Sequence, residues 1–204
     1  MAKIKLTKGE LKKQRDSLKQ FRHYLPTLQL KKQQLQMKIL EARKLFEKRL
    51  SALFEVENRI KLWMGLLADP AVNITEWIMP TEVLTDTTNI AGANIPVYKD
   101  VRFKEIDYDF YTTPFWVDQG ILELRELMKL LIETNVIREQ IKTLQRELQV
   151  TTQRVNLFEK IKIPECLENI RRIRIYLGDL MANAVGISKV AKGKVESREE
   201  AAVA

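Results

Sequence analysis

The sequence is poor in the residues that interrupt regular structure. Its 204 residues include only 7 glycines and 6 prolines, and Pro80, Pro96 and Pro114 all fall between residues 80 and 114. Gly and Pro are the strongest local breakers of helices and strands, so the rest of the chain has few signals that could start a turn. This scarcity excludes a fold of many short elements and favours a few very long ones.

Cysteine and long apolar runs are also scarce. The single cysteine, Cys166, excludes an internal disulfide framework and suits a reducing compartment. No apolar segment follows the basic start, and the longest apolar cluster, WMGLLA at 63–68, is far shorter than the roughly 20 residues of a membrane-spanning helix. We therefore expect a cytoplasmic protein with no direct membrane insertion, which would reach a membrane only through a partner.

Motifs for chemistry are missing too. No phosphate-binding G-x-x-x-x-G-K-[ST] loop occurs, and the carboxylates lie mostly on the polar faces of the expected helices. His23 and Cys166 could approach each other, but a zinc site takes three or four ligands, so a surface histidine and a core thiol are the favoured interpretation. We expect no catalytic residue, no cofactor, no metal and no small-molecule ligand.

Apolar residues instead recur every seven positions in the first third of the chain. Steps of seven from Leu11 to Leu67 meet apolar residues at eight of nine positions, and a companion set from Gln14 to Trp63 is mostly apolar as well. Such a sustained register is typical of a coiled-coil seam. A helix over 11–67 would be roughly 85 Å long, too long for a compact domain of this size.

Two charged residues, Lys32 and Arg49, occupy positions in this seam. Their aliphatic stems can cover the apolar stripe while their charged ends reach water, which is the interpretation we favour. Alternatively, they mark the register, because a polar residue at a seam position disfavours slipped pairings at some cost in stability.

A second seam runs over residues 127–158 and is then displaced. The next heptad step gives Lys162, but the apolar set resumes one residue late, at Ile163, and continues to Ile187. A slip of one residue requires a local change in helical winding. Pro164, which lacks a backbone N–H, stands where a bend or a loosened turn would occur.

Two long helices with facing seams fold most simply into an antiparallel hairpin. Aligning Leu67 with Leu127 sets the register and places Leu11 opposite the region of Asn183. The predicted fold class is therefore all-α, a long two-helix coiled-coil hairpin with a small β-hairpin or flap in its connection. The expected segments are a first helix in 1–69, a connection over 70–113, a second helix over 114–190 and a frayed tail over 191–204.

The connection differs in composition from the helices. Apolar and polar residues alternate over 97–103 and again over 106–110, which predicts a small β-hairpin. The second helix should follow with Thr113 as its N-cap and Pro114 at its first position. We expect the tryptophans to pack around the base of the helical hairpin: Trp63, Trp77 and Trp116.

Positive charge is concentrated at the start of the chain. The net charge is +8, and residues 1–22 hold eight basic residues against two acidic ones. Such a segment could be a solvated tail or could contact an acidic protein, a nucleic acid or an anionic membrane surface. The first 20 residues contain no aromatic side chain, which weakens the case for nucleic acid.

Three stretches carry a resemblance to a known family. They are LTKGELKKQRDSLK at the start, NIAGANIPV in the connection and QRVNLFEKIKIPECLENIRRI near the end. The chain resembles the D subunit of the V-type and A-type rotary ATPases over almost its whole length. The last stretch matches the family's RVNALE…IP signature, with Phe158 replacing a smaller residue.

The resemblance implies a non-catalytic rotor shaft, whose chain ends rise inside a ring of ATP-binding subunits while its connection points toward the membrane. The implied partners are the catalytic and non-catalytic ring subunits, a small central-stalk subunit and a membrane-sector adaptor, with no nucleic acid, and the chain would be peripheral to the membrane through this complex. The implied site residues are a ring-facing shaft end (Lys8, Lys12, Lys13, Arg15), the signature and bend (Arg154, Val155, Asn156, Leu157, Glu159, Ile163, Pro164) and the connection flap (Ile90, Gly92, Ile95, Pro96, Val97).

Two other function classes stay open from the residues alone. One is a coiled-coil chaperone resembling prefoldin, and the other is a basic coiled-coil arm that binds RNA or DNA. Prefoldin-like helices are shorter and leave apolar tips to grip their clients, whereas the first seam here stays apolar over residues 11–67. This length favours the shaft.

Overall fold

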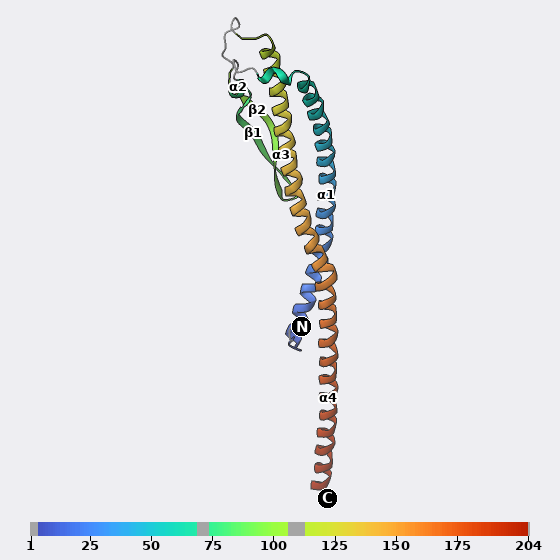
Figure 1. Ribbon diagram of the computed structural model, residues 1–204. Coiled ribbons are helices and arrows are strands. Elements are labelled where there is room, and N and C mark those ends of the chain that lie inside the picture. Colours follow the sequence, from blue (N-terminus) through green and yellow to red (C-terminus); the bar gives the residue numbers. More distant parts are fainter. Residues whose placement is uncertain (1–3, 69–73, 106–112, 204) are drawn as a thin grey trace. The chain divides into compact units, whose positions relative to one another are not determined.

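The computed structural model describes residues 4–68, 74–105 and 113–203 and consists of long helices and one small β-hairpin (Figure 1). In chain order the elements are α1 (Lys8–Lys61), the 3₁₀ turn η1 (Met64–Ala68), the short α2 (Thr75–Ile78), β1 (Pro80–Ile90), β2 (Ala93–Phe103), α3 (Trp116–Asn156), the π-helical turn η2 (Leu157–Lys162) and α4 (Ile163–Val203). The predicted fold class is confirmed.

The chain divides into two compact units, each of which pairs part of α1 with part of the second long helix. The terminal unit holds the chain up to residue 30 and from residue 152 onward, and the hairpin unit holds residues 31–151. The flap, formed by β1 and β2, belongs to the hairpin unit.

The heptad positions of α1 form the buried side of the helix. Every seam position from Leu11 to Leu67 and from Gln14 to Trp63 is buried or half-buried, whereas most positions between them are exposed. The second helix shows the same pattern, and its polar seam residue Thr134 is 3 % exposed and donates its hydroxyl to the carbonyl of Leu130. Burial at the period of a coiled coil confirms the first predicted seam and the second one as far as Leu177. The prediction was wrong beyond that point, because the seam positions Leu180, Ala184 and Ile187 are exposed.

The register of the helix pair differs from the predicted one. Arg49 Nε lies 2.9 Å from Glu133 Oε1, where the predicted register gives Gln145 as the facing residue. In the terminal unit, the ring of Phe21 lies 5.0 Å from that of Phe158. The partner on the second helix is therefore about twelve to fifteen residues earlier than expected at these two positions.

This shift has its cause at the closed end of the hairpin. The predicted register aligned Leu67 with Leu127, but α1 ends at Lys61 and the chain tightens into η1. The two helices are instead closed by Trp63 and Trp116, whose ring centroids are 6.3 Å apart. Gly120 makes room for both, because a Cβ there would lie 3.3 Å from an atom of each indole.

The flap is a two-stranded antiparallel sheet closed by a two-residue turn. Ala91 (φ 51°) and Gly92 (φ 81°) occupy the left-handed region, which is the geometry of a type I′ turn. The prediction of a β-hairpin is right, and the predicted strand over 97–103 lies within β2, but β2 pairs with the preceding segment β1 (Pro80–Ile90). The predicted strand over 106–110 lies outside the described residues. A local hydrogen bond stabilises this turn, because the backbone N–H of Gly92 donates to Asn89 Oδ1 at 3.0 Å.

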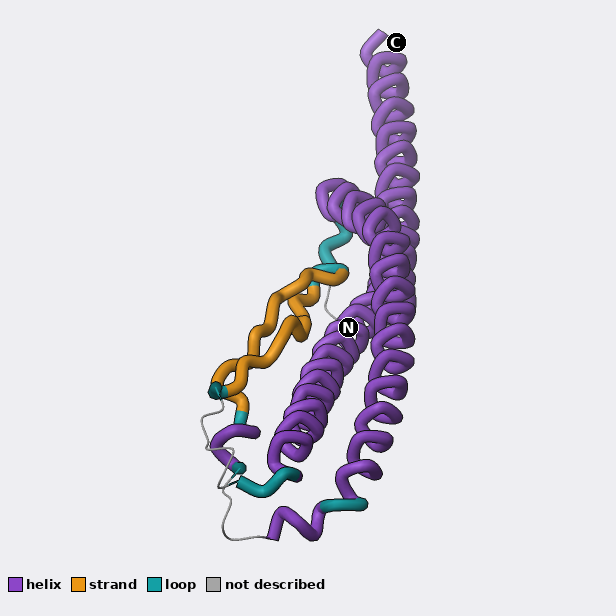
Figure 2. The backbone as a smooth tube through the Cα atoms, turned by 90° about the horizontal axis from the view of Figure 1, so that it is seen from above, coloured by secondary structure: helices purple, strands orange, loops and turns teal. Residues whose placement is uncertain are grey.

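The tip of the flap is part of the core. Ala93 and Ile95 pack with buried residues from both long helices, namely Leu35, Ile39 and Leu144. The side-chain amide of Gln140 donates to the carbonyl of Pro96. In Figures 1 and 2 the strands run beside α3, so the flap covers one side of the helix pair in this unit.

The other end of the flap is held by Arg125 of α3. Its guanidinium donates to the backbone carbonyls of Trp77 at 2.9 Å and Lys104 at 2.6 Å, and it lies 5.0 Å from the centre of the Phe103 ring. The flap is thus fixed at both ends to the helices.

The one-residue slip of the second seam coincides with η2. In this turn the backbone N–H of Ile163 bonds to the carbonyl of Phe158, five residues back, instead of four as in an α-helix. The wider turn takes up one extra residue, so both Phe158 and Ile163 keep inward positions. Pro164, which has no backbone N–H to donate to the preceding turn, directly follows η2 at the start of α4. The predicted change in helical winding is therefore present.

Both ends of the second helix differ from the expectation. The predicted first position was Pro114, but α3 begins two residues later, at Trp116. The carbonyl of Pro114 accepts a hydrogen bond from the N–H of Val117 at 3.1 Å. α4 continues to Val203, through the tail that was expected to fray. The tail's Ala, Lys, Glu and Arg residues favour helix even where no seam exists.

Candidate interaction site

A groove of about 650 Å³ lies between α1 and α4 in the terminal unit. Its rim carries five cationic side chains and no carboxylate: Arg15, Lys19, Arg22, Arg171 and Arg174. Its apolar lining consists of Leu18, Leu167, Ile170 and Ile175. The arrangement can bind an anionic group and an apolar group side by side.

Helical spacing builds this groove. Positions 15, 18, 19 and 22 share one face of α1, and positions 167, 170, 171, 174 and 175 share one face of α4. Ile170 forms the deep part and is 6 % exposed, while Leu167 and Ile175 are 44 % and 56 % exposed. The seam thus supplies the floor, and the flanking positions supply the charges.

The five cations have no partner in the part of the chain that the structure describes. None of them forms an ion pair or hydrogen bond there, although the adjacent Arg172 pairs with Glu168 at 3.0 Å. Neighbouring like charges on a helix face repel one another, so the groove carries an unbalanced positive potential.

Of the predicted shaft-end residues, only Arg15 lines the groove. Lys8, Lys12 and Lys13 are exposed in the first turns of α1 and do not line the groove. The predicted set did not include the other cations of the groove, Lys19, Arg22, Arg171 and Arg174. Their helical spacing was visible in the sequence, but bringing the two sets together required the helix register.

The signature residues around η2 fall into an inner and an outer set. Val155 is buried and Ile163 is half-buried, so these two belong to the seam. The outer set is exposed: Arg154, Asn156, Leu157, Glu159 and Pro164. Cys166, two residues beyond Pro164, is buried, and burial raises the pKa of its thiol, whereas His23 is exposed.

The predicted flap residues lie mostly at the contact with the helices. Ile95 is 4 % exposed, and Ile90, Pro96 and Val97 are half-buried, so only Gly92 at the turn is exposed. Their placement explains why this stretch has small and β-branched residues. It also means that the flap stabilises the hairpin unit and is no free appendage.

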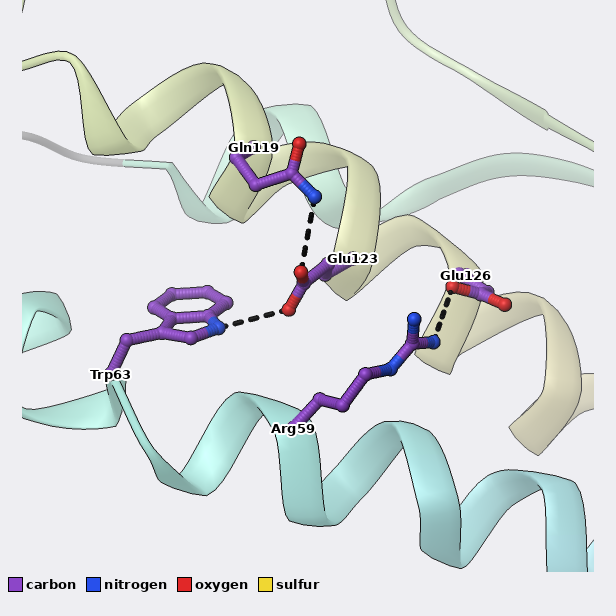
Figure 3. Close-up of polar contacts among 5 residues, drawn as sticks. All are labelled: Arg59, Trp63, Gln119, Glu123 and Glu126. Carbon is purple, nitrogen blue, oxygen red and sulfur yellow. Dashed lines mark hydrogen bonds and ion pairs between the residues drawn. The ribbon is translucent and has the colours of Figure 1, made fainter.

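The closed end of the hairpin has a polar cluster (Figure 3). Glu123 accepts hydrogen bonds from Trp63 Nε1 at 2.9 Å and Gln119 Nε2 at 3.1 Å, while Arg59 pairs with Glu126 at 3.0 Å. The bonds from Gln119 and Trp63 lower the pKa of the Glu123 carboxyl. Large apolar side chains near this end are exposed: Leu62, Met64, Leu66, Phe115 and Leu122.

The far part of α4 has no buried side. Every described side chain from residue 178 onward is exposed, including Leu180, Met181, Val185, Ile187 and Val190. Large exposed apolar surfaces occur in proteins at sites that bind other proteins, membranes or ligands.

Neither a membrane-spanning helix nor a metal-binding cluster occurs in the described parts of the chain. No helix there combines the length and apolar character that crossing a bilayer requires. The same residues contain no group of three or more His, Cys, Asp or Glu side chains placed to hold a metal ion.

Comparison with known protein families shows which family this chain belongs to. The sequence profile of the ATP synthase D subunits matches residues 10–193, which include both seams, the flap and η2. The chain belongs to the ATP synthase D-subunit family.

Individual relatives cover nearly the whole chain. It is 42 % identical to a V-type ATP synthase D subunit from Borreliella burgdorferi, over 96 % of both chains. It is 31 % identical to the protein of that name from Chlamydia muridarum, over 98 % of this chain and 99 % of the relative. The Chlamydia felis protein is 33 % identical, over 98 % of this chain and 97 % of its own.

Proposed function

We propose that this chain is the non-catalytic central shaft of a V-type ATP synthase or ATPase. In this role it couples nucleotide hydrolysis or synthesis in a surrounding ring to rotation and ion movement in a membrane sector. The observation that carries the proposal is the match to the D-subunit family over nearly its full length. This match favours the shaft over a chaperone or a nucleic-acid-binding arm.

The distribution of exposed surface supports this role. The terminal unit offers an unpaired cationic groove and an exposed α4, which suit contacts with ring subunits. The closed end of the hairpin offers exposed apolar residues such as Phe115 and Leu62, which suit a membrane-sector adaptor. A side of the helix pair that the flap leaves open would receive the small central-stalk partner. Membrane association is then peripheral, through the complex.

The turn η2 adds a structural asymmetry to the shaft. Lys160 and Ile161 are carried on the wider π-helical turn, next to the exposed Pro164. A shaft must present different surfaces to different ring subunits in order to set them in different states. We propose that the signature residues supply one such surface, with Arg154, Asn156 and Glu159 pointing outward.

A cleavable cross-link tests rotation. Ser188 is exposed on α4, and Ser188→Cys provides a reactive thiol, while the native Cys166 is buried. The purified complex carrying this variant is labelled with a photo-cross-linker that contains a disulfide. If the chain turns inside the ring, cross-linking it to a ring subunit stops ATP hydrolysis, and reduction restores it.

The complex with the unaltered chain is the matched control, because the only thiol of this chain is buried and the reagent should leave the activity unchanged. Hydrolysis that continues at its full rate in a cross-linked complex would show that the chain does not rotate against the ring. Absence of ATP-binding subunits from the purified complex would contradict the proposal at an earlier stage.

A further inference from the structure

We infer that the cationic groove of the terminal unit binds an acidic amphipathic segment of a partner protein, with an apolar side chain of the partner in the groove and its carboxylates on the rim. The inference deepens the proposed function, and it rests on that function only for the partner being a ring subunit. The chemistry of the groove is argued from this chain alone.

The first argument is the missing counter-charge. Arg15, Lys19 and Arg22 are three or four residues apart on α1, and Arg171 and Arg174 face them from α4. Like charges at such spacing destabilise a helix. In the hairpin unit the comparable Arg49 and Arg59 are paired with carboxylates on α3. The groove lacks such partners among the described residues, so an anionic partner from outside would relieve the repulsion.

The second argument is the composition of the groove between the charges. Leu167 and Ile175 are about half exposed, and they continue the buried surface of Ile170 out to solvent. A cluster of charges that only faces solvent would not need this apolar surface. A small inorganic anion bound to the arginines would leave the apolar surface exposed to water. A leucine-like side chain would remove it from water, and the flanking guanidinium groups would bind carboxylates in paired hydrogen bonds.

The third argument concerns the kind of macromolecule. Proteins that hold single-stranded nucleic acid combine positive charge with aromatic side chains on which bases stack. The lining of this groove contains no aromatic residue. Its cations span about two helical turns of α1, roughly 10 Å, which matches two to three turns of a partner helix.

Binding of a designed probe tests the inference on the full chain. The probe is a fluorescent helical peptide of about four turns, with leucines on one face and glutamates on both sides of them. A second peptide has serine in place of each leucine. We expect the leucine peptide to bind and the serine peptide to bind at least about tenfold more weakly, because only the first covers the apolar floor.

Two double variants locate the binding. Arg171→Gln with Arg174→Gln should weaken the leucine peptide by about tenfold or more. Lys189→Gln with Lys194→Gln removes the same charge from exposed positions of α4 outside the groove and should have little effect. Circular dichroism should show equal helix content in both variants, since the groove arginines are exposed and form no internal ion pair among the described residues.

Three outcomes would overturn the inference. They are no binding of the leucine peptide to the unaltered chain, equal loss in the two double variants, and equal binding of the serine peptide or a single-stranded oligonucleotide at the same arginines. The last would make the groove a general anion surface. If the peptide binds as expected but the chain does not purify with ATP-binding subunits, only the proposed function fails. If the complex assembles and rotates but the peptide ignores the groove, only this inference fails.

Discussion

The two units of the chain differ in the kind of ion pair they form. In the hairpin unit, cations pair with carboxylates across elements, as in Arg49–Glu133 and Arg59–Glu126 between the helices and Lys99–Asp86 within the flap. Among the described residues of the terminal unit, the ion pairs Lys162–Glu165 and Arg172–Glu168 join neighbours on one helix. Ion pairs between elements therefore occur in the hairpin unit, whereas those of the terminal unit, among the described residues, stay within one helix.

The two units also differ in how far they bury their apolar side chains. The hairpin unit buries Leu35, Ile39 and Leu144 under the tip of the flap. In the terminal unit, burial on α4 ends after Leu177, and the helix continues with exposed apolar residues. Similar heptad patterns are therefore buried throughout the hairpin unit but only as far as Leu177 in the terminal unit.

The largest expected effect comes from deleting a single residue, which shifts the seam by one position. Such deletions test whether each unit tolerates the shift. Deleting Gln36 from α1 should rotate one side of the hairpin unit's seam by about 100° and abolish cooperative unfolding. Deleting Lys160 from η2 should instead convert the π-helical turn into a regular α-helix and preserve cooperative unfolding. Thermal unfolding followed by circular dichroism distinguishes the two.

The reason for tolerance at Lys160 is that the deletion restores one heptad frame across Phe158 and Ile163. If deleting Lys160 were as damaging as deleting Gln36, the wider turn would have another cause than the one-residue slip.

The next effect concerns the buried core. Leu144 is 1 % exposed beneath the flap, so Leu144→Ala should lower the free energy of unfolding by about 2–5 kcal/mol. Leu180 is 47 % exposed on α4, and Leu180→Ala should change it by less than about 0.5 kcal/mol. Urea unfolding of the isolated chain measures both. Equal losses would mean that the exposed part of α4 is packed in solution.

A smaller effect is expected from the cross-helix ion pair. Arg49 Nε lies 2.9 Å from Glu133 Oε1, but its N–H does not point along this contact, so the interaction is an ion pair without a well-formed hydrogen bond. A double-mutant cycle with Arg49→Met and Glu133→Gln should give a coupling of about 1 kcal/mol or less. The coupling should shrink as salt is added.

The matched measurement in the terminal unit is Arg171→Met, which should not destabilise the isolated chain, because Arg171 has no internal partner among the described residues. A loss equal to that of Arg49→Met would contradict the contrast between the units.

The smallest effect is a dependence on pH at the closed end of the hairpin. Hydrogen bonds from Gln119 and Trp63 hold the pKa of Glu123 below its ordinary value of 4.5. Its contribution to stability is therefore fully present above pH 4.5 and is lost as the pH falls through the lowered value. Glu123→Gln should flatten the acid side of the stability curve, measured by urea unfolding from neutral pH down to about pH 3. An unchanged curve would show that other carboxyl groups dominate.

Much of the fold could be predicted from local periodicity. The seams over 11–67 and 127–177, the slip before Ile163 and the β character of the connection were all visible, because each depends on residues within a few turns of one another. The slip also predicted a change in winding at the position where η2 lies. The start of the basic surface at Arg15 was visible for the same reason.

The sequence by itself determined the helices, their buried faces and the excess of positive charge near the start, since helical spacing and composition are local properties. Only the tertiary structure decided which residues meet. A heptad repeat looks much the same after a shift of one or two heptads, so the seam could not show that Arg49 faces Glu133 or that Arg171 and Arg174 join Arg22. Closure at Trp63 and Trp116 selected the register, and the register created both the internal ion pairs and the unpaired cationic groove.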